Sequence, residues 1–217
     1  MAFGGASRRK IADPIFEPLW AGQRVLVHAD AVGVAARDET GTAIAVPDEL
    51  LEKIAAALLA TAAVIDGYLV PGPLADTSGI DAAVGMDALM RPNEVARQMF
   101  LGGGGRNERR EARDAEAARR VRVGPDEIVA FVAVDLLHID GVTLLDVPLQ
   151  ERKRLLDSIL RDDDLVRRSV TVRTPVEAWY AQWKALGFRE LAVKSANGRY
   201  RPGERAPDWG TEIIPRR

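Results

Sequence analysis

The amino-acid sequence predicts an α+β fold built mainly from antiparallel sheets flanked by helices. First, short apolar runs typical of strands are mixed with amphipathic helical stretches along the 217 residues. Second, the strand-like runs 24–28 and 32–36 are separated only by a short turn containing Asp30, which is the spacing of a hairpin. Because regular strand–helix–strand repeats are missing from this order, a doubly wound parallel sheet is not expected.

The composition is that of a globular protein and argues against several classes of protein and of binding site. Apolar residues make up 47% of the chain and charged residues 29%. Cysteine is absent and the only histidines are His28 and His138, so disulfides and thiolate metal sites are excluded and no metal centre is expected. Neither a membrane-length apolar run nor an apolar signal core is present, so we expect a cytoplasmic protein. A net charge of −2 argues against indiscriminate binding to nucleic acid.

The elements after the hairpin follow from local signals. A helix is predicted to begin at Asp48, because Pro47 precedes an acidic first turn. Its apolar face carries Leu50, Ile54 and Leu58. The next strand is predicted over 64–70 and is ended by a Pro-Gly-Pro turn.

Two segments are predicted to lie outside the core. Residues 1–13 are small, basic and aperiodic, which predicts a flexible arm. Residues 74–124 predict a mobile insertion, with four glycines at 102–105 followed by seven arginines and four acids over 106–122. A nucleic-acid contact by this Arg-rich part is the alternative, although no aromatic residue is interleaved for base stacking.

Regular structure is expected again after Asp126. Residues 128–137 are a nearly continuous apolar run around Asp135, which predicts a strand buried on both faces. A turn through Asp140 follows, and the next helix is predicted to begin near Pro148. Its inward side is assigned Leu149, Leu156, Ile159 and Leu160, and its exposed face Glu151, Arg152, Lys153 and Arg154.

A further helix is predicted over 175–186. Thr174 is placed to cap it, Pro175 suits the first position and Glu177 completes a capping box. Gly187 is predicted to end it. The apolar stripe of this helix, which we assign to core packing, consists of Val176, Trp179, Tyr180, Trp183 and Leu186.

The last strand leads to Lys194 and then into a glycine- and arginine-bearing loop. A short apolar run, 191–193, precedes Lys194, and the loop carries Arg199, Arg201 and Arg205. A movable ammonium beside rigid guanidinium groups suits an anionic ligand. The alternative is a strand end with solvated charges.

Five segments, in order, resemble the adenylation (nucleotidyltransferase) domain of ATP-dependent DNA ligases. They are residues 17–24, Asp66-Gly67, 131–141, 147–156 and 194–209. The resemblance covers roughly residues 13–213, with 74–124 outside it. It implies the fold that ligases share with mRNA-capping enzymes, which is similar to ATP-grasp domains.

The resemblance also implies a chemistry that this sequence no longer supports. Ligases attack ATP with a lysine to make covalent lysyl-AMP, and Leu19, which has no lone pair, stands at that position. Further departures from the family pattern are Ala21 for an aspartate, Tyr68 for a glutamate, Val134 for the aromatic that stacks on adenine, Arg189 for a glutamate, and Thr211 and Ile213 for two lysines. Because metal-bound triphosphate needs carboxylates and cations, neither ATP nor magnesium is expected as a cofactor.

The residues that remain define the candidate binding sites. The resemblance assigns nucleotide or phosphate contacts to Arg24, Arg37, Asp66, Asp135 and Lys194. The arginine loop, Arg199, Arg201 and Arg205, is the candidate nucleic-acid surface. The first interpretation is therefore a catalytically inactive ligase-like domain that binds nucleic acid, a nucleotide or a DNA-repair protein.

Two other interpretations remain open at this point. In one, the domain is an active ligase that uses ATP and magnesium with a relocated nucleophile, Lys194 or Lys10. In the other, it is a structural subunit whose cleft is filled by Leu19, Trp20, Tyr68 and Val134.

Single residues also have plainer interpretations. Asp66 and Asp135 could only cap turns, and Arg24 could pair with Glu17. The 217 residues reach little beyond Trp209, so we do not expect an OB-fold domain within them. The oligomeric state is not predicted.

Overall fold

The computed structural model describes residues 2–4, 11–72, 74 and 128–215. Apart from Leu74, the predicted insertion at 74–124 lies outside the described residues, and so does Lys10.

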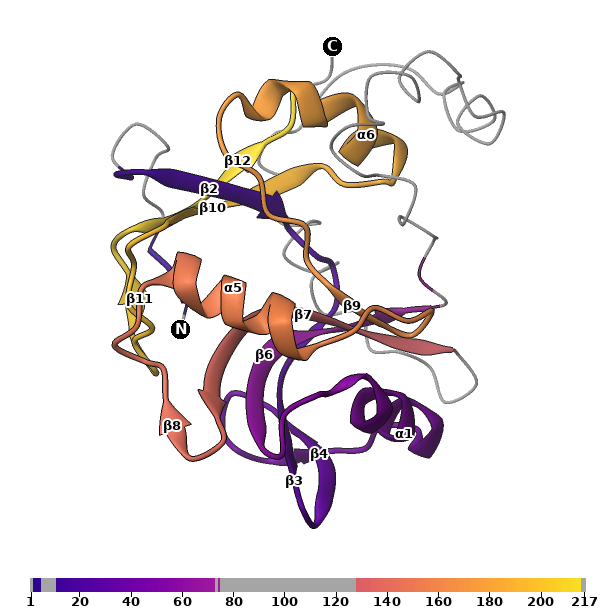
Figure 1. Cartoon of the computed structure of the whole chain (residues 1–217). Helices are drawn as coiled ribbons and strands as arrows, with labels where there is room; N and C mark the ends of the chain where they lie inside the picture. The colour runs from indigo at the N-terminus through magenta and orange to yellow at the C-terminus, as the bar shows by residue number, and fades with distance from the viewer. Residues whose placement is uncertain (1, 5–10, 73, 75–127, 216–217) are drawn as a thin grey trace.

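Two sheets lie one above the other, as Figure 1 shows. The larger has the strand order β5-β4-β3-β6-β7-β8, with β9 beside β7. Its pairs are antiparallel except β7 with β9, which confirms the predicted sheet type and the hairpin of β3 and β4. Its strands are β3 (Gln23–Asp30), β4 (Gly33–Arg37), β5 (Ala43–Ile44), β6 (Ala63–Pro71), β7 (Val129–Ile139), β8 (Val142–Thr143) and β9 (Val166–Arg168).

The smaller sheet has the order β12-β10-β2 and is antiparallel. Its strands are β2 (Pro14–Pro18), β10 (Glu190–Ser195) and β12 (Trp209–Ile213). Beside it, β1 (Ala2–Phe3) pairs in parallel with β11 (Arg205–Ala206). Of the described residues within 1–13, Phe3 lies 5.7 Å from Trp209 between ring centroids and Ile11 is buried, whereas Gly4, Ala12 and Asp13 are exposed.

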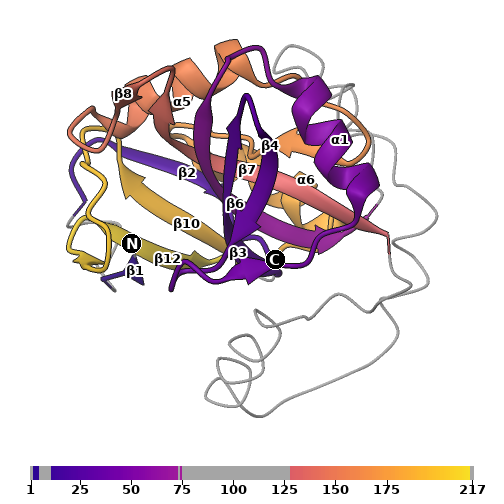
Figure 2. The same ribbon diagram turned by 90° about the horizontal axis from the view of Figure 1, so that it is seen from below.

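The helices cover and separate the sheets. Helix α1 (Asp48–Ala57) begins where predicted and contacts β4, β7 and β9, with Leu50 and Ile54 buried in the core of the larger sheet. Figures 1 and 2 show α1 beside this larger sheet, away from the smaller one. Helix α5 (Leu149–Ile159) lies between the two sheets. No helix among the described residues is long and apolar enough to cross a membrane.

The position of α5 corrects the predicted exposed face. Arg154 is exposed, but Arg152 is 0% and Lys153 8% exposed. The reason is that α5 has protein on two sides: Leu149 packs with Ile15 and Ala196 beside the smaller sheet, whereas Leu156 belongs to the core of the larger one. Charges that would be solvated on a surface helix are buried here.

The aromatic segment after Thr174 is less regular than predicted. A 3₁₀ turn, Val176–Trp179, leads into the short helix α6 (Tyr180–Ala185), and no side chain caps either element. Gly187 ends the segment at φ +90°, as predicted. Val176 and Trp183 are buried in a core cluster with strands β2 and β10, but Leu186 is 42% exposed. Its assignment to the core was wrong, because it follows the last helical turn.

Candidate functional site

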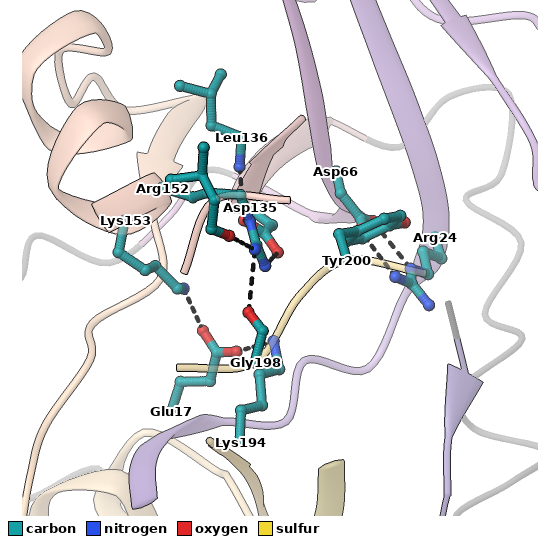
Figure 3. A network of polar contacts seen from close by, with 11 residues as sticks. Glu17, Arg24, Asp66, Asp135, Leu136, Arg152, Lys153, Lys194, Gly198 and Tyr200 are labelled. Carbon is teal, nitrogen blue, oxygen red and sulfur yellow. Dashed lines mark hydrogen bonds and ion pairs between the residues drawn. The ribbon is translucent and has the colours of Figure 1, made fainter. Parts of the chain in front are cut away.

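Three carboxylates and four cations meet between the two sheets (Figure 3). All but Arg24 have a residue exposure of 8% or less. The carboxylates are Glu17 on β2, Asp66 on β6 and Asp135 on β7; the cations are Arg24 on β3, Arg152 and Lys153 on α5, and Lys194 on β10. We call these seven residues the buried charge cluster.

Asp66 and Asp135 are direct neighbours across β6 and β7. Like charges in such a pair repel each other, so each needs its own cation. Arg24 donates from Nε to Oδ1 of Asp66 at 2.9 Å and also contacts Oδ2 with Nη2. Arg152 donates to Asp135 from Nε at 2.8 Å and from Nη2 at 2.7 Å. Both aspartates therefore form two-point pairs within strands, and the interpretation as turn caps is wrong.

Tyr200 completes the environment of Asp66. Its hydroxyl donates to Oδ2 of Asp66 at 3.0 Å. Burial acts to raise the pKa of Asp66, but Arg24, Lys194 and this hydrogen bond together hold it below the ordinary value. Burial, together with the charge of Asp66, raises the pKa of Tyr200. Asp66 is thus a carboxylate and Tyr200 a protonated donor at neutral pH.

Arg152 connects three parts of the chain. Besides its pair with Asp135, Nη1 donates to the carbonyl oxygens of Val147, at 2.5 Å, and Gly198, at 3.2 Å. The start of α5, strand β7 and the loop after β10 are thereby joined at one guanidinium. All three nitrogens of Arg152 are engaged by protein atoms.

Glu17 lies between two lysines. It pairs with Ala192 across β2 and β10, so Lys194, two residues further along, is on the same face. Lys153 Nζ donates to Oε2 of Glu17 at 2.6 Å, and Lys194 Nζ contacts Oε1. Burial alone would raise the pKa of Glu17, but the two lysines lower it below the ordinary value. Glu17 is the partner of these lysines, and its expected pairing with Arg24 was wrong.

Lys194 is enclosed by its neighbours. Its side chain is 3% exposed, and Nζ lies 4.4 Å from the ring centroid of Trp209, within cation–π distance. The lysine that we expected to contact phosphate therefore already has an internal carboxylate and an aromatic face.

The other predicted basic residues lie at the surface. Arg37 is exposed at the end of β4 and donates to the Gly41 carbonyl at 3.0 Å. The three arginines of the arginine loop are exposed between β10 and β12; Arg199 donates to the Asp146 carbonyl, and Arg201 lies 4.0 Å from Glu204. The structure does not bring these four residues into the buried charge cluster.

Leu19 and Trp20 follow β2 and border an open hollow of about 400 Å³. The Leu19 amide donates to the Glu190 carbonyl at 3.0 Å, and Trp20 donates from Nε1 to Ser169 Oγ at 3.0 Å. We call this hollow the Leu19 hollow; its lining includes Leu19, Trp20, Val70, Leu186, Phe188 and Arg189. Of the four residues that the filled-cleft interpretation named, Leu19, Trp20, Tyr68 and Val134, the first two belong to the lining of this hollow.

Comparison with known proteins decides the family. The profile described as "ATP dependent DNA ligase domain" matches residues 6–210. The chain belongs to this family. A DNA ligase of Thermococcus onnurineus is 28% identical in an alignment 204 residues long that covers 91% of this chain and 32% of that protein. A probable DNA ligase of Streptomyces griseus is 31% identical over 94% of this chain and 36% of that protein. The chain thus spans about a third of these relatives.

Solved structures confirm the nucleotidyltransferase fold of this ligase domain. The ligase domain of Mycobacterium tuberculosis LigD aligns with a TM-score of 0.60 at 24% identity, over 98% of this chain and 58% of that one. A mycobacterial DNA ligase D complexed with ATP and MES aligns with a TM-score of 0.59 at 22% identity, over the same shares of the two chains.

Four residues at the centre of this ligase domain were missed as site residues: Glu17, Arg152, Lys153 and Tyr200. A signal existed for Glu17, because a lone acid in the apolar strand Pro14–Pro18 needs a buried partner. No sequence signal indicated that Arg152 and Lys153 would be buried, because the run Glu-Arg-Lys-Arg is typical of a solvated helix face.

Proposed function

We propose that this ligase-like domain does not form lysyl-AMP and acts as a DNA-binding module. One observation supports the proposal beside the ligase resemblance, which implies that Leu19 occupies the nucleophile position: Lys194, our candidate for a relocated nucleophile, is buried against Glu17. An ammonium held as the partner of a carboxylate has no lone pair with which to attack a phosphate. This supports inactivity over a relocated nucleophile at Lys194.

Other described lysines are also engaged. Lys53 contacts Asp163 and Asp164 at 3.0 Å, and Lys184 donates to the Pro215 carbonyl at 2.7 Å. Lys153 belongs to the buried charge cluster.

The carboxylates of the buried charge cluster do not fit magnesium-bound ATP. Magnesium prefers carboxylate oxygens, but both oxygens of Asp66 and of Asp135 are bound to arginine. Within the described ranges, no group of three or more histidine, aspartate or glutamate side chains is placed to hold a metal. We propose that the buried charge cluster stabilises the fold.

The exposed arginines of the arginine loop are our candidates for contacts with phosphate. Arg199, Arg201 and Arg205 are exposed on one loop, and guanidinium groups bind phosphate with two parallel hydrogen bonds. Contacts of this kind position a protein on DNA without reading its sequence. The arginine loop supports binding to the backbone of duplex DNA.

The proposal is tested by fluorescence anisotropy with a labelled duplex, intact or nicked. If three phosphates are contacted, affinity falls roughly 40-fold between 50 and 200 mM salt, from a slope of about 0.9 per phosphate. Replacing the three loop arginines with glutamine should weaken binding and remove most of this salt dependence. The matched control changes Arg154 and Arg161, which are exposed elsewhere, to glutamine.

An affinity that does not change with salt concentration would contradict the assignment to the arginine loop. An equal loss of affinity in the arginine-loop variant and in the control variant would contradict it too. No measurable DNA binding at 50 mM salt would instead favour the structural-subunit interpretation. The observation that favours it is the buried charge cluster, whose members are engaged in internal ion pairs.

A further inference from the structure

The arginine loop is bordered by the N-terminal strand of the chain. Strand β11, which carries Arg205, pairs in parallel with β1 in a two-stranded sheet. In this pairing Ala2 lies opposite Arg205 and Phe3 lies opposite Ala206. Figure 1 shows the N-terminus beside β11. Strand β1 is therefore in direct backbone contact with the loop that we propose as the DNA-binding surface.

The two backbones approach most closely at Gly4. Its amide donates to the carbonyl of Trp209, the residue at which β12 begins, at 3.2 Å. A Cβ on Gly4 would overlap the carbonyl group of Ala206, whose carbon atom would lie only 2.8 Å away. Because this obstacle is backbone and not a flexible side chain, any larger residue at this position would push β1 away from the loop.

Aromatic packing holds β1 against the base of the loop. The half-buried ring of Phe3 lies 5.7 Å from the ring of Trp209, and Trp209 lies 6.4 Å from Tyr200 in an edge-to-face arrangement. All three belong to one apolar cluster with Ala206 and Leu137. Two strands alone are marginally stable in water, so the position of β1 depends on this packing.

Pairing with β1 fixes which side chains of β11 face outward. Successive residues of a strand point to opposite sides. Ala206 is 1% exposed, and its neighbour Arg205 is accordingly exposed to solvent. The first part of the loop has a different anchor, because Tyr200 donates from its hydroxyl to Asp66 and from its amide to the Leu145 carbonyl. The loop is thus held by the larger sheet near its start and by β1 near its end.

We propose that β1 is a positioning element for DNA binding, which holds Arg205 in the orientation that contacts a phosphate. The inference rests on the proposed function of the arginine loop and adds Phe3 and Gly4 as residues on which that function depends. An ordered loop loses less conformational entropy on binding than a loose one. Strand β1 therefore raises the affinity for DNA through the loop.

Two substitutions release β1 by different means: Phe3→Ala removes the ring contact, and Gly4→Ala forces the backbones apart. Fluorescence anisotropy with a labelled duplex should show weaker binding by both at 50 mM salt. The fall in affinity between 50 and 200 mM salt should shrink from roughly 40-fold to roughly 12-fold, because two phosphates are contacted instead of three at about 0.9 each. Phe3→Tyr keeps the ring and should bind like the parent.

A second measurement needs no DNA. Trypsin cleavage of the Arg205–Ala206 bond, followed by mass spectrometry, should be faster in Phe3→Ala and in Gly4→Ala, because cleavage requires local opening of the loop. Circular-dichroism melts check that each variant is folded. Gly4 is an exposed position near the chain end, so Gly4→Ala decides the matter if Phe3→Ala does not fold.

Matched controls alter the same residue types elsewhere. Phe188→Ala removes another partly buried ring, which packs 4.8 Å from Trp20 and precedes β10, whereas the arginine loop follows that strand. Gly41→Ala adds a methyl group at a turn with nothing within 4 Å of the new Cβ. Both controls should keep the parent's DNA affinity, salt dependence and cleavage of the Arg205–Ala206 bond.

The outcomes separate this inference from the proposed function. If the parent binds DNA and both variants keep its affinity and salt dependence, β1 does not position the loop, and the proposed function stands. Unchanged cleavage at Arg205 in both variants would overturn the inference as well. An equal loss of affinity in Phe188→Ala would show a general effect of destabilisation. No DNA binding by the parent would contradict the proposed function and, with it, this inference.

Discussion

Asp135 and Arg152 are the most deeply buried ion pair in the described structure, with both side chains 0% exposed. The pair persists because its polar atoms are satisfied: Asp135 accepts from Arg152 and from its neighbour's amide, and Arg152 also reaches two carbonyls. A buried pair of this kind adds little over an apolar pair, but removing one partner leaves a charge uncompensated.

Arg152→Ala should therefore lower the free energy of unfolding by about 3–5 kcal/mol in urea titrations. The control is Arg154→Ala, which removes an exposed arginine paired with Glu151 and should lower the free energy of unfolding much less, because solvent screens an exposed pair. Equal losses in the two variants would show that the buried position of Arg152 is unimportant. The double variant Asp135→Leu/Arg152→Leu should lose less free energy of unfolding than Arg152→Ala, because it leaves no unpaired charge in the interior.

The pH dependence of stability is expected to depend on Glu17. Its pKa in the folded protein is below the ordinary value, because Lys153 and Lys194 outweigh the effect of burial. Its stabilising contribution is thus complete above the unfolded pKa of about 4.3 and is lost as the pH falls through the lower folded pKa. The pKa of Asp66 is also lowered in the folded protein, so its contribution to stability is likewise lost at low pH.

Glu17→Gln should be less stable than the parent at pH 7, with a difference that shrinks as the pH falls towards 3. Urea midpoints measured from pH 7 to pH 3 test this expectation. Glu204→Gln, at an exposed loop position, serves as the control and should follow the parent curve. A Glu17→Gln curve parallel to the parent would contradict the assignment.

At the scale of elements, the sequence predicted most strands and helices because each carries its own local signal. The hairpin, α1, β6, β7 and β10 are marked by apolar runs, turns and acidic first turns. The packing between elements has no such signal. Arg152 and Lys153 were predicted to be exposed because nothing in α5 itself reveals a second sheet above it. Asp66 and Asp135 lie opposite each other only because of the register between β6 and β7, which neither strand's own sequence reveals.

The close approach of β6 and β7 explains the glycine after Asp66. A Cβ on Gly67 would lie 2.4 Å from Cε2 of Phe131 and 2.4 Å from the Val132 carbonyl oxygen. Backbone cannot move away as a flexible side chain can, so the two strands would separate. The aspartate pair beside them would then lose its geometry.

Gly67→Ala should consequently cost about 1–3 kcal/mol or more, the range for overpacking a core. Gly41→Ala is a useful comparison, because Gly41 has φ +85° with nothing within 4 Å of the added Cβ. Gly41→Ala should therefore lower the free energy of unfolding only by the strain of an alanine in the left-handed region, about 1 kcal/mol. A Gly67→Ala protein as stable as Gly41→Ala in thermal unfolding would show that the strands accommodate the methyl group.

At the scale of the whole molecule, the ligase fold contains a cluster of buried charges that pair with one another. The fold is that of DNA ligase nucleotidyltransferase domains, and the chain matches the family over residues 6–210. Between the sheets, four cations face three carboxylates, and Leu19 borders an apolar hollow. Two of these ion pairs link α5 to both sheets, because Arg152 pairs with Asp135 of the larger sheet and Lys153 with Glu17 of the smaller one.

The central claim is that no lysine of this protein becomes adenylated. Intact-protein mass spectrometry after incubation with ATP and magnesium tests it directly, with an active DNA ligase labelled in parallel. We expect an unchanged mass, because Leu19 has no nucleophilic atom and Lys194 is held by Glu17. A mass increase equal to one AMP, mapped by peptide analysis to any of the five lysines, would contradict the claim and make the protein an active nucleotidyltransferase.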